Sequence, residues 1–128
     1  MATIVAGIKP FFGAARAFTE VLLGGPTIEV ESNPTATNSV TVLLQANPDR
    51  VGLVFVNQGA NDVFISLNAG VSTTNGIRLA ASGGSITMDV RGDFTIPSRT
   101  WFAITTAGTS AMYILEVNRY GYTPPGEK

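Results

Sequence analysis

Two pairs of carboxylates are the first side chains in this sequence to consider for chemistry. Glu29 and Glu31 are two residues apart, so on a β-strand they share one face, and Asp89 and Asp93 bracket a short turn. A pair of acids can serve glycoside hydrolysis or bind Ca²⁺. Neither pair lies in a cluster of further polar ligands such as D-x-D-x-D-G. Solvated strand and turn charges are therefore the favoured interpretation.

Other groups that commonly carry catalysis are missing. The 128 residues include no histidine and no cysteine, which removes the commonest general base, the commonest metal ligand and any thiolate. The two lysines, Lys9 and Lys128, lie near opposite termini, which argues against a Schiff-base or Ser–Lys mechanism. Glycine-rich pieces do not follow a strand and open a helix, so Gly59, Gly83 and Gly84 are predicted to be turn residues with positive φ. We therefore expect no enzyme activity, no cofactor and no metal.

Two binding motifs have structural alternatives. Arg91-Gly92-Asp93 is a tripeptide that adhesion receptors can recognise, but Gly-Asp is also a common hairpin turn. Exposed aromatic side chains could stack on sugars, as in a carbohydrate-binding module. Alternation instead places Phe55 with Leu53, and Tyr113 with Leu115, on shared faces. The favoured prediction is that the aromatic residues fill a core.

The composition favours contact with other protein. Charged residues make up only 13% of the chain, while 45% are hydrophobic and the formal net charge is -1. The mean hydropathy is +0.25. A net charge so close to zero creates no positive potential that would attract phosphate backbones, so nucleic acid is not expected as a partner. A low charge density is typical of a surface that faces protein, although a neutral, hydroxyl-rich sandwich surface is the alternative.

The N-terminal segment differs from the rest of the chain. Its apolar residues from Phe11 to Leu23 follow the i, i+3, i+4, i+7 spacing of one helical face, and Gly24-Gly25-Pro26 ends the pattern. A helix this short is marginal alone, so it must dock on its own domain or on a neighbour. It is too short and too charged to span a membrane, and the first ten residues do not read as a secretory signal. Residues 26–38 resemble a linker, or alternatively a first strand and loop.

From residue 39 the period becomes two, with turn residues at short intervals. Two loops are predicted to close hairpins, Gln58-Gly59-Ala60-Asn61 and `TAGTS`. Without helices between the strands, about seven or eight short strands indicate an all-β antiparallel sandwich or small barrel. The expected strands are Val40–Leu44, Val51–Asn57, Val63–Leu67, Ile77–Leu79, Ile86–Val90, Phe94–Ile96, Trp101–Thr105 and Met112–Val117. The predicted division is an N-terminal arm with a short helix and linker (1–38), a sandwich (39–119) and a C-terminal tail (120–128).

A pattern of turns and strands between residues 47 and 116 resembles a small all-β module of tailed-bacteriophage virion proteins. It covers a little over half of the chain and contains no active-site signature. The matching pieces are Asn47 to Arg50, Asn57 to Gly59, Val63 to Leu67, Gly76 to Leu79, Ala81 to Ser85 and Ala103 to Glu116. The resemblance implies a jelly-roll-like sandwich and, most closely, a capsid decoration (cement) protein on the virion surface.

That resemblance leads to specific expectations. The protein would bind the outer capsid and bridge subunits of the major capsid protein, as a homo-oligomer (dimer or trimer), made in the host cytoplasm. The alternatives are a tail, neck or fibre component and a carbohydrate-binding adhesion module. The residues expected to contact the capsid or another subunit are apolar or aromatic and lie near the two termini: Phe11, Phe12, Phe18, Val21, Leu22, Tyr120 and Tyr122.

Overall fold

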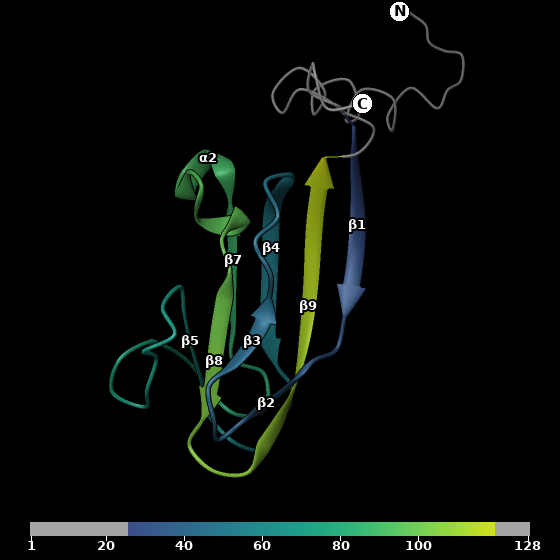
Figure 1. The fold of residues 1–128 in the computed structure, drawn as a ribbon. Coiled ribbons are helices and arrows are strands. Elements are labelled where there is room, and N and C mark those ends of the chain that lie inside the picture. The colour runs from purple at the N-terminus through teal and green to yellow at the C-terminus, as the bar shows by residue number, and fades with distance from the viewer. Residues whose placement is uncertain (1–25, 120–128) are drawn as a thin grey trace, which may run out of the picture.

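Two antiparallel sheets packed face to face make up the protein (Figure 1). The structure is a computed structural model, and it describes residues 26–119. The strands are β1 (Thr27–Ser32), β2 (Thr35–Thr37), β3 (Thr41–Leu44), β4 (Arg50–Asn57), β5 (Val63–Ser66), β6 (Ile77–Leu79), β7 (Ser85–Asp89), β8 (Trp101–Thr105) and β9 (Thr109–Arg119). Between β7 and β8 lie a single helical turn, α2 (Val90–Asp93), and a 3-10 turn, η1 (Ile96–Ser98).

The order of the strands is that of a jelly roll. One sheet runs β1-β9-β4-β7, with β2 also paired to β9, and the other runs β3-β8-β5-β6. Among the described strands, β5 and β6 are the only consecutive ones that pair with each other. The connections from β2 to β3, β3 to β4, β4 to β5, β6 to β7, β7 to β8 and β8 to β9 all cross between sheets. The predicted jelly-roll-like sandwich is thereby confirmed.

Both predicted hairpins are wrong. The residues on either side of the 58–61 loop form β4 and β5 as expected, but β4 pairs with β7 and β9, whereas β5 pairs with β6 and β8. The loop between β8 and β9 likewise joins strands of different sheets. Each loop is therefore an arch over the end of the sandwich. Alternation along a strand identifies its inward face, but it does not identify the neighbouring strand.

Three further differences concern single elements. Residues 27–37 form β1 and β2 and pair along β9, which differs from the predicted linker and confirms the alternative of a first strand and loop. The predicted strand Phe94–Ile96 is wrong, because this segment leads from α2 into η1 and Phe94 has a φ of 58°. The third difference concerns β3, where a bulge between Val42 and Leu44 turns Val42 outward while Leu44 stays buried.

The core lies between the sheets and is built from alternate residues of the central strands. Phe55 and Trp101 meet edge to face, with ring centroids 5.3 Å apart. Their neighbours are buried aliphatic side chains: Leu43, Leu44, Leu53, Val63, Ile65, Leu79, Met88, Met112 and Ile114. Phe55 and Leu53 are in the core as predicted, whereas Tyr113 and Leu115 lie on the outer face of β9, next to the inward-facing Met112 and Ile114.

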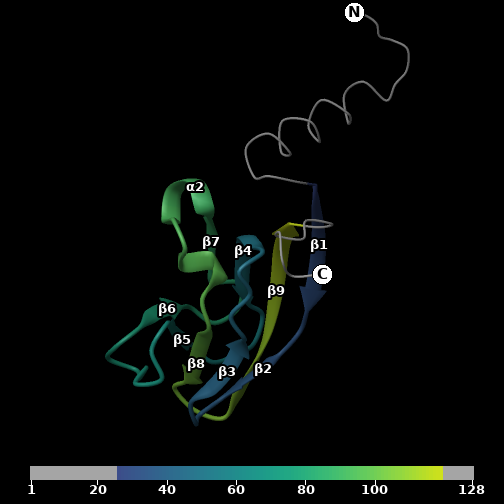
Figure 2. The same cartoon turned by 45° about the horizontal axis from the view of Figure 1, so that its top comes forward.

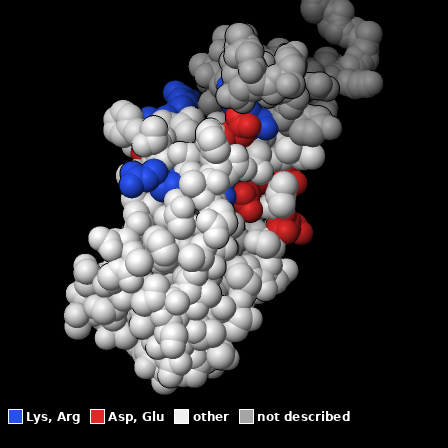
Figure 3. All heavy atoms as spheres, in the orientation of Figure 1, with Lys and Arg blue, Asp and Glu red and all other residues white. Residues whose placement is uncertain are grey.

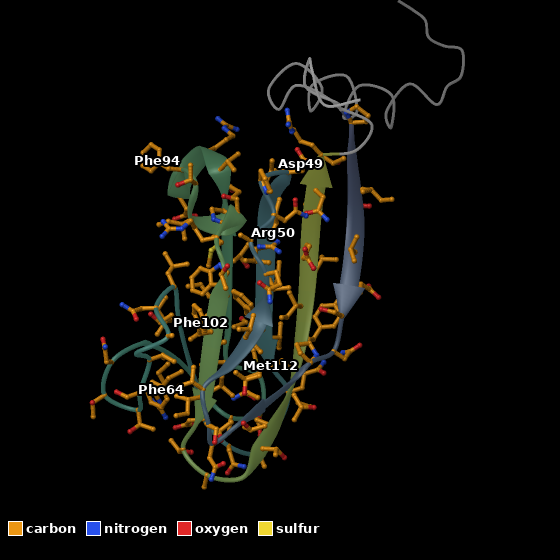
Figure 4. All side chains as sticks on the ribbon, viewed as in Figure 1. Asp49, Arg50, Phe64, Phe94, Phe102 and Met112 are labelled. Atoms are coloured by element: carbon orange, nitrogen blue, oxygen red, sulfur yellow. The ribbon has the colours of Figure 1, made fainter. Side chains whose placement is uncertain are left out.

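A buried arginine holds one end of the sandwich, which we call the Arg50 end. Arg50 is 3% exposed, and its Nε donates to Glu116 Oε1 at 2.9 Å. Its Nη1 donates to the carbonyl oxygens of Pro97 and Arg99, and its Nη2 to that of Gln45 at 2.7 Å. One guanidinium thus joins β9, the segment around η1 and the β3–β4 loop. Figure 4 places Arg50 between the sheets near the end that carries α2.

A neutral side chain holds the opposite end, which we call the Asn57 end. Asn57 is fully buried, and its Nδ2 donates to the carbonyl oxygens of Asn61 and Leu79 at 2.8 and 2.9 Å. Its Oδ1 accepts from Ser110 Oγ at 2.6 Å and from the Gly59 N–H. The three arches between β4 and β5, β6 and β7, and β8 and β9 therefore meet at one amide.

Close approach explains two of the predicted turn glycines, and positive φ explains the third. A Cβ on Gly59 would lie 2.7 Å from Ser110 Cα, and one on Gly84 would lie 2.6 Å from the Ala80 carbonyl oxygen. Gly83 has the predicted positive φ, at 121°. Positive φ was thus the wrong reason for Gly59 and Gly84.

Candidate docking surface

The seven terminal residues predicted to contact a capsid or another subunit lie outside the described residues. They are Phe11, Phe12, Phe18, Val21, Leu22, Tyr120 and Tyr122. The candidate surface is therefore built from side chains between residues 26 and 119.

The carboxylate pairs do not converge on a site. Glu31 accepts a hydrogen bond from the Tyr113 hydroxyl at 2.9 Å, and this bond raises the pKa of Tyr113. Asp89 caps α2 by accepting from the Arg91 and Gly92 N–H groups, while Asp93 accepts from the Asp89 N–H. Between residues 26 and 119, no group of three potential metal-ligating side chains is found. Both pairs serve local structure, and the Arg-Gly-Asp tripeptide forms α2 itself.

The outer face of the β3-β8-β5-β6 sheet is apolar. Paired residues of antiparallel strands point to the same side, so Val42 lies beside Phe102, and Ile104 lies beside Phe64. We call these four residues the aromatic face. Val42 is 42% exposed and the other three are half-buried. The charged side chain next to this group is Arg78, opposite Phe64 on β6, which is paired with Asp62. This is a sheet face without a covering layer in the described part of the chain.

Apart from the pair of Arg78 and Asp62, the charged side chains in this view gather away from that surface. In the view of Figure 3, the lower half of the molecule carries no charged residue, and the charged groups lie toward the end with α2. At this end Arg119 Nη2 also meets Asp49 Oδ1 at 2.8 Å. The face in view is thus divided into a charged part and a neutral part.

An apolar pocket of about 260 Å³ lies where β5 and β6 meet η1. Trp101 lines it, and its Nε1 is buried with no hydrogen-bond partner among the described residues. Ile77 and Ile96 also line it and are 42% and 37% exposed. The remaining lining residues are Ile65, Ser66, Leu67 and Gly76. The pocket can hold an apolar side chain.

Phe94 stands out at the Arg50 end because it is both exposed and strained. Its side chain is 76% exposed, and Figure 4 shows it pointing away from the sandwich beside α2. Its φ of 58° and ψ of -123° lie outside the regions that side-chain-bearing residues normally adopt. Such a conformation costs about 1–3 kcal/mol and recurs at functional sites. Phe94 is therefore a candidate anchor for a partner.

Sequence reasoning missed the pocket and Phe94 for related reasons. It assigned Phe94 to a strand and Trp101 to the core without an open side. The signal that was available is Pro97, which is disfavoured inside a strand and follows the Gly92-Asp93 turn closely. The pocket joins β5, β6, η1 and β8, so its residues are scattered over more than thirty positions, from Ile65 to Trp101.

Comparisons with known proteins do not identify a family for this chain. No protein-family model matches the chain, and no curated protein matches it. It is similar to a solved structure described as Bacillus endospore appendages that form a family of disulfide-linked pili, with 17% identity and a TM-score of 0.45. The similarity covers 73% of this chain and 86% of that one. None of the described helices is long and apolar enough to cross a membrane.

Proposed function

We propose that this chain is a non-enzymatic structural protein of a bacteriophage virion, a capsid decoration protein that binds the major capsid protein. The observation that carries the proposal is the aromatic face, an uncovered sheet surface of Val42, Phe64, Phe102 and Ile104. Contiguous apolar surface of this kind marks protein contact. The jelly-roll order and the pattern from Asn47 to Glu116 add support, because the resemblance to virion modules implies both.

The binding would be that of a protein interface with a few anchors. Aromatic side chains dominate such interfaces, and Phe64, Phe102 and the exposed Phe94 are of that type. Affinity depends on such anchors and on preorganisation more than on area. Many copies on one shell would add avidity. A homo-oligomer, and contacts by the terminal residues from Phe11 to Leu22 and by Tyr120 and Tyr122, belong to the same proposal.

Co-sedimentation with purified undecorated capsids tests the proposal. The wild-type protein should bind, and Phe102→Asp should bind at least tenfold more weakly, because a buried charge without a partner opposes the interface. The matched control is Tyr113→Asp, which places the same charge on the half-buried outer face of the other sheet and should leave binding unchanged. Equal binding by all three proteins would remove the aromatic face from the interface. No binding by the wild type, together with specific hits on a glycan array, would favour the adhesion alternative.

Deletion of residues 1–25 tests the predicted contact segment separately. The variant keeps every described strand, since β1 begins at Thr27, and circular dichroism checks that the sandwich is intact. We expect weaker capsid binding. Wild-type affinity after the deletion would exclude a role for this segment in the interface while leaving the aromatic face untouched.

A further inference from the structure

The pocket between β6 and η1 has the features of an acceptor site rather than of a packing defect. Most of its lining is aliphatic or aromatic, and two of its side chains, Ile77 and Ile96, are more than one-third exposed. Trp101 supplies the largest aromatic surface of this lining. An occupant that brings an apolar side chain would fit it.

The chain enters the sandwich at the same end as the pocket. Figures 1 and 2 both show the start of β1 and α2 at one end of the molecule. The hydrogen bonds of Arg119 N to Asp49 O, and of Asn47 N to Ser98 O, connect the partner of Thr27 to η1. Three strand spacings from β1 to β7 amount to about 15 Å, and the two sheets are about 10 Å apart.

The N-terminal segment is long enough to cover that distance. Twenty-five residues precede Pro26. If residues 24–26 are extended and the predicted helix precedes them, Phe18 lies within about 20 Å of the start of β1 and Phe11 within about 28 Å. A segment of this length is therefore long enough to reach the pocket of its own sandwich.

We propose that the apolar face of the segment from Phe11 to Leu22 docks in the pocket of its own sandwich, with an aromatic side chain inserted between Ile77, Ile96 and Trp101. A cavity of roughly 150 Å³ holds a benzene ring, so a pocket of about 260 Å³ accommodates a phenylalanine side chain. Since the segment is tethered, its effective concentration at the pocket reaches the millimolar range.

This inference goes beyond the proposed function, because it concerns the free protein and needs no capsid. It gives the predicted helix the partner surface that a helix of this length requires. It also assigns the two faces of the helix different tasks. Phe11 and Phe18 lie on the apolar face that docks, whereas Phe12 lies off that face and stays available to another molecule.

Trp101 makes the test direct, since it is the only tryptophan in the chain. In the full-length protein, Phe18→Ser should shift the Trp101 emission to the red and increase its quenching by acrylamide, because water enters the vacated pocket. Phe12→Ser is the matched control and should leave both unchanged. Ile96→Glu, which places a charge in the pocket lining, should reproduce the Phe18→Ser effect. Unchanged emission and quenching in Phe18→Ser would overturn the proposal.

Crosslinking then identifies whose pocket is filled. The chain has no cysteine, so Phe18→Cys with Ile96→Cys supplies the only two thiols for a short flexible bis-maleimide. An internally linked monomer is the expected product, and Phe12→Cys with Ile96→Cys should give clearly less of it. Linked dimers in place of internally linked monomers would overturn the assignment to the same sandwich. Neither experiment measures capsid binding. A negative result would therefore overturn the docking of the segment without bearing on the proposed function.

Discussion

The two ends of the sandwich are held together by different chemistry. At the Arg50 end, a charged guanidinium joins β9, η1 and the β3–β4 loop through Glu116 and three carbonyl oxygens. At the Asn57 end, one neutral amide joins three arches through Ser110 and backbone groups. Both side chains are almost fully buried. Loops are thus held over the core by a charged side chain at one end and by a neutral side chain at the other.

The difference has an energetic consequence. A buried charge that loses its partner is costly, whereas a buried neutral group costs only its unmade hydrogen bonds. The stability of the Arg50 end therefore depends strongly on the pairing of Arg50 with Glu116. At the Asn57 end, the loss of a partner should cost less stability. The Arg50 end also carries Phe94 and the pocket, so the more firmly fixed end presents the strained residue.

The largest effect is expected for Arg50→Met. This change leaves Glu116 buried without its partner and removes the donors to three carbonyl oxygens. The free energy of unfolding should fall by about 3–5 kcal/mol, measured by urea denaturation. Arg50→Met combined with Glu116→Leu should recover part of this loss, because the isolated charge is gone. A loss no larger than that of Asn57→Ala would break the comparison.

A smaller loss, about 2–3 kcal/mol, is expected for Asn57→Ala. It removes the donor to the carbonyl oxygens of Asn61 and Leu79 and the acceptor of the Ser110 hydroxyl, which keeps its second hydrogen bond, to the Asn61 carbonyl oxygen. Asn57→Asp should be at least as destabilising at neutral pH, because it directs a buried carboxylate at those carbonyl oxygens. Its deficit should shrink in acid, when the introduced carboxyl is protonated and donates again. A deficit independent of pH would contradict this account.

Gly59→Ala probes the same end by crowding it. The new Cβ would contact Ser110 Oγ closely and lie 2.7 Å from Ser110 Cα and 2.8 Å from the Ala111 nitrogen. Because two of these atoms belong to the backbone, relief requires movement of β9, and we expect a loss of about 1–3 kcal/mol. Gly83→Ala is the matched control for strain without contact, since nothing lies within 4 Å of a Cβ there. If the two variants lose the same stability, crowding at Ser110 is not the cause.

Strands could be found from the sequence because alternation reports burial directly. Val51–Asn57, Ile77–Leu79 and Trp101–Thr105 match β4, β6 and β8 within a residue. Sheet membership could not be found this way. The arch after Asn57 has the same turn residues as a hairpin. The feature that tells the arch from a hairpin is the close approach of Gly59 to Ser110, which lies more than fifty residues away in the sequence.

Three of the residues that carry the resemblance proved to be scaffold residues. Arg50 and Asn57 stand in the N-x-x-R and N-x-G pieces of the pattern, and Glu116 ends it. In the structure these three residues close the two ends of the sandwich. The pattern therefore indicates how the jelly roll is held together. Among the candidate docking residues, Phe94 and those around the pocket depend on which loops meet, and local alternation contains no information about that.

The smallest effect concerns an ion pair at the Asn57 end, Asp62 with Arg78. The pKa of Asp62 is lowered, first by the hydrogen bond from the Ala81 N–H and then by that from Arg78. A lowered folded-state pKa means that Asp62 contributes stability above its unfolded value of about 3.9, and that this contribution is lost as pH falls through the folded value. Asp62→Asn should therefore shift the urea midpoint down slightly at pH 7, and the shift should shrink as the pH falls through the lowered folded-state pKa of Asp62, below which a protonated Asp62 resembles asparagine. Because the backbone bond is the larger cause, Arg78→Gln should have a still smaller effect at pH 7. If Arg78→Gln were the more damaging change, charge would matter at the Asn57 end too, and the contrast between the two ends would be lost.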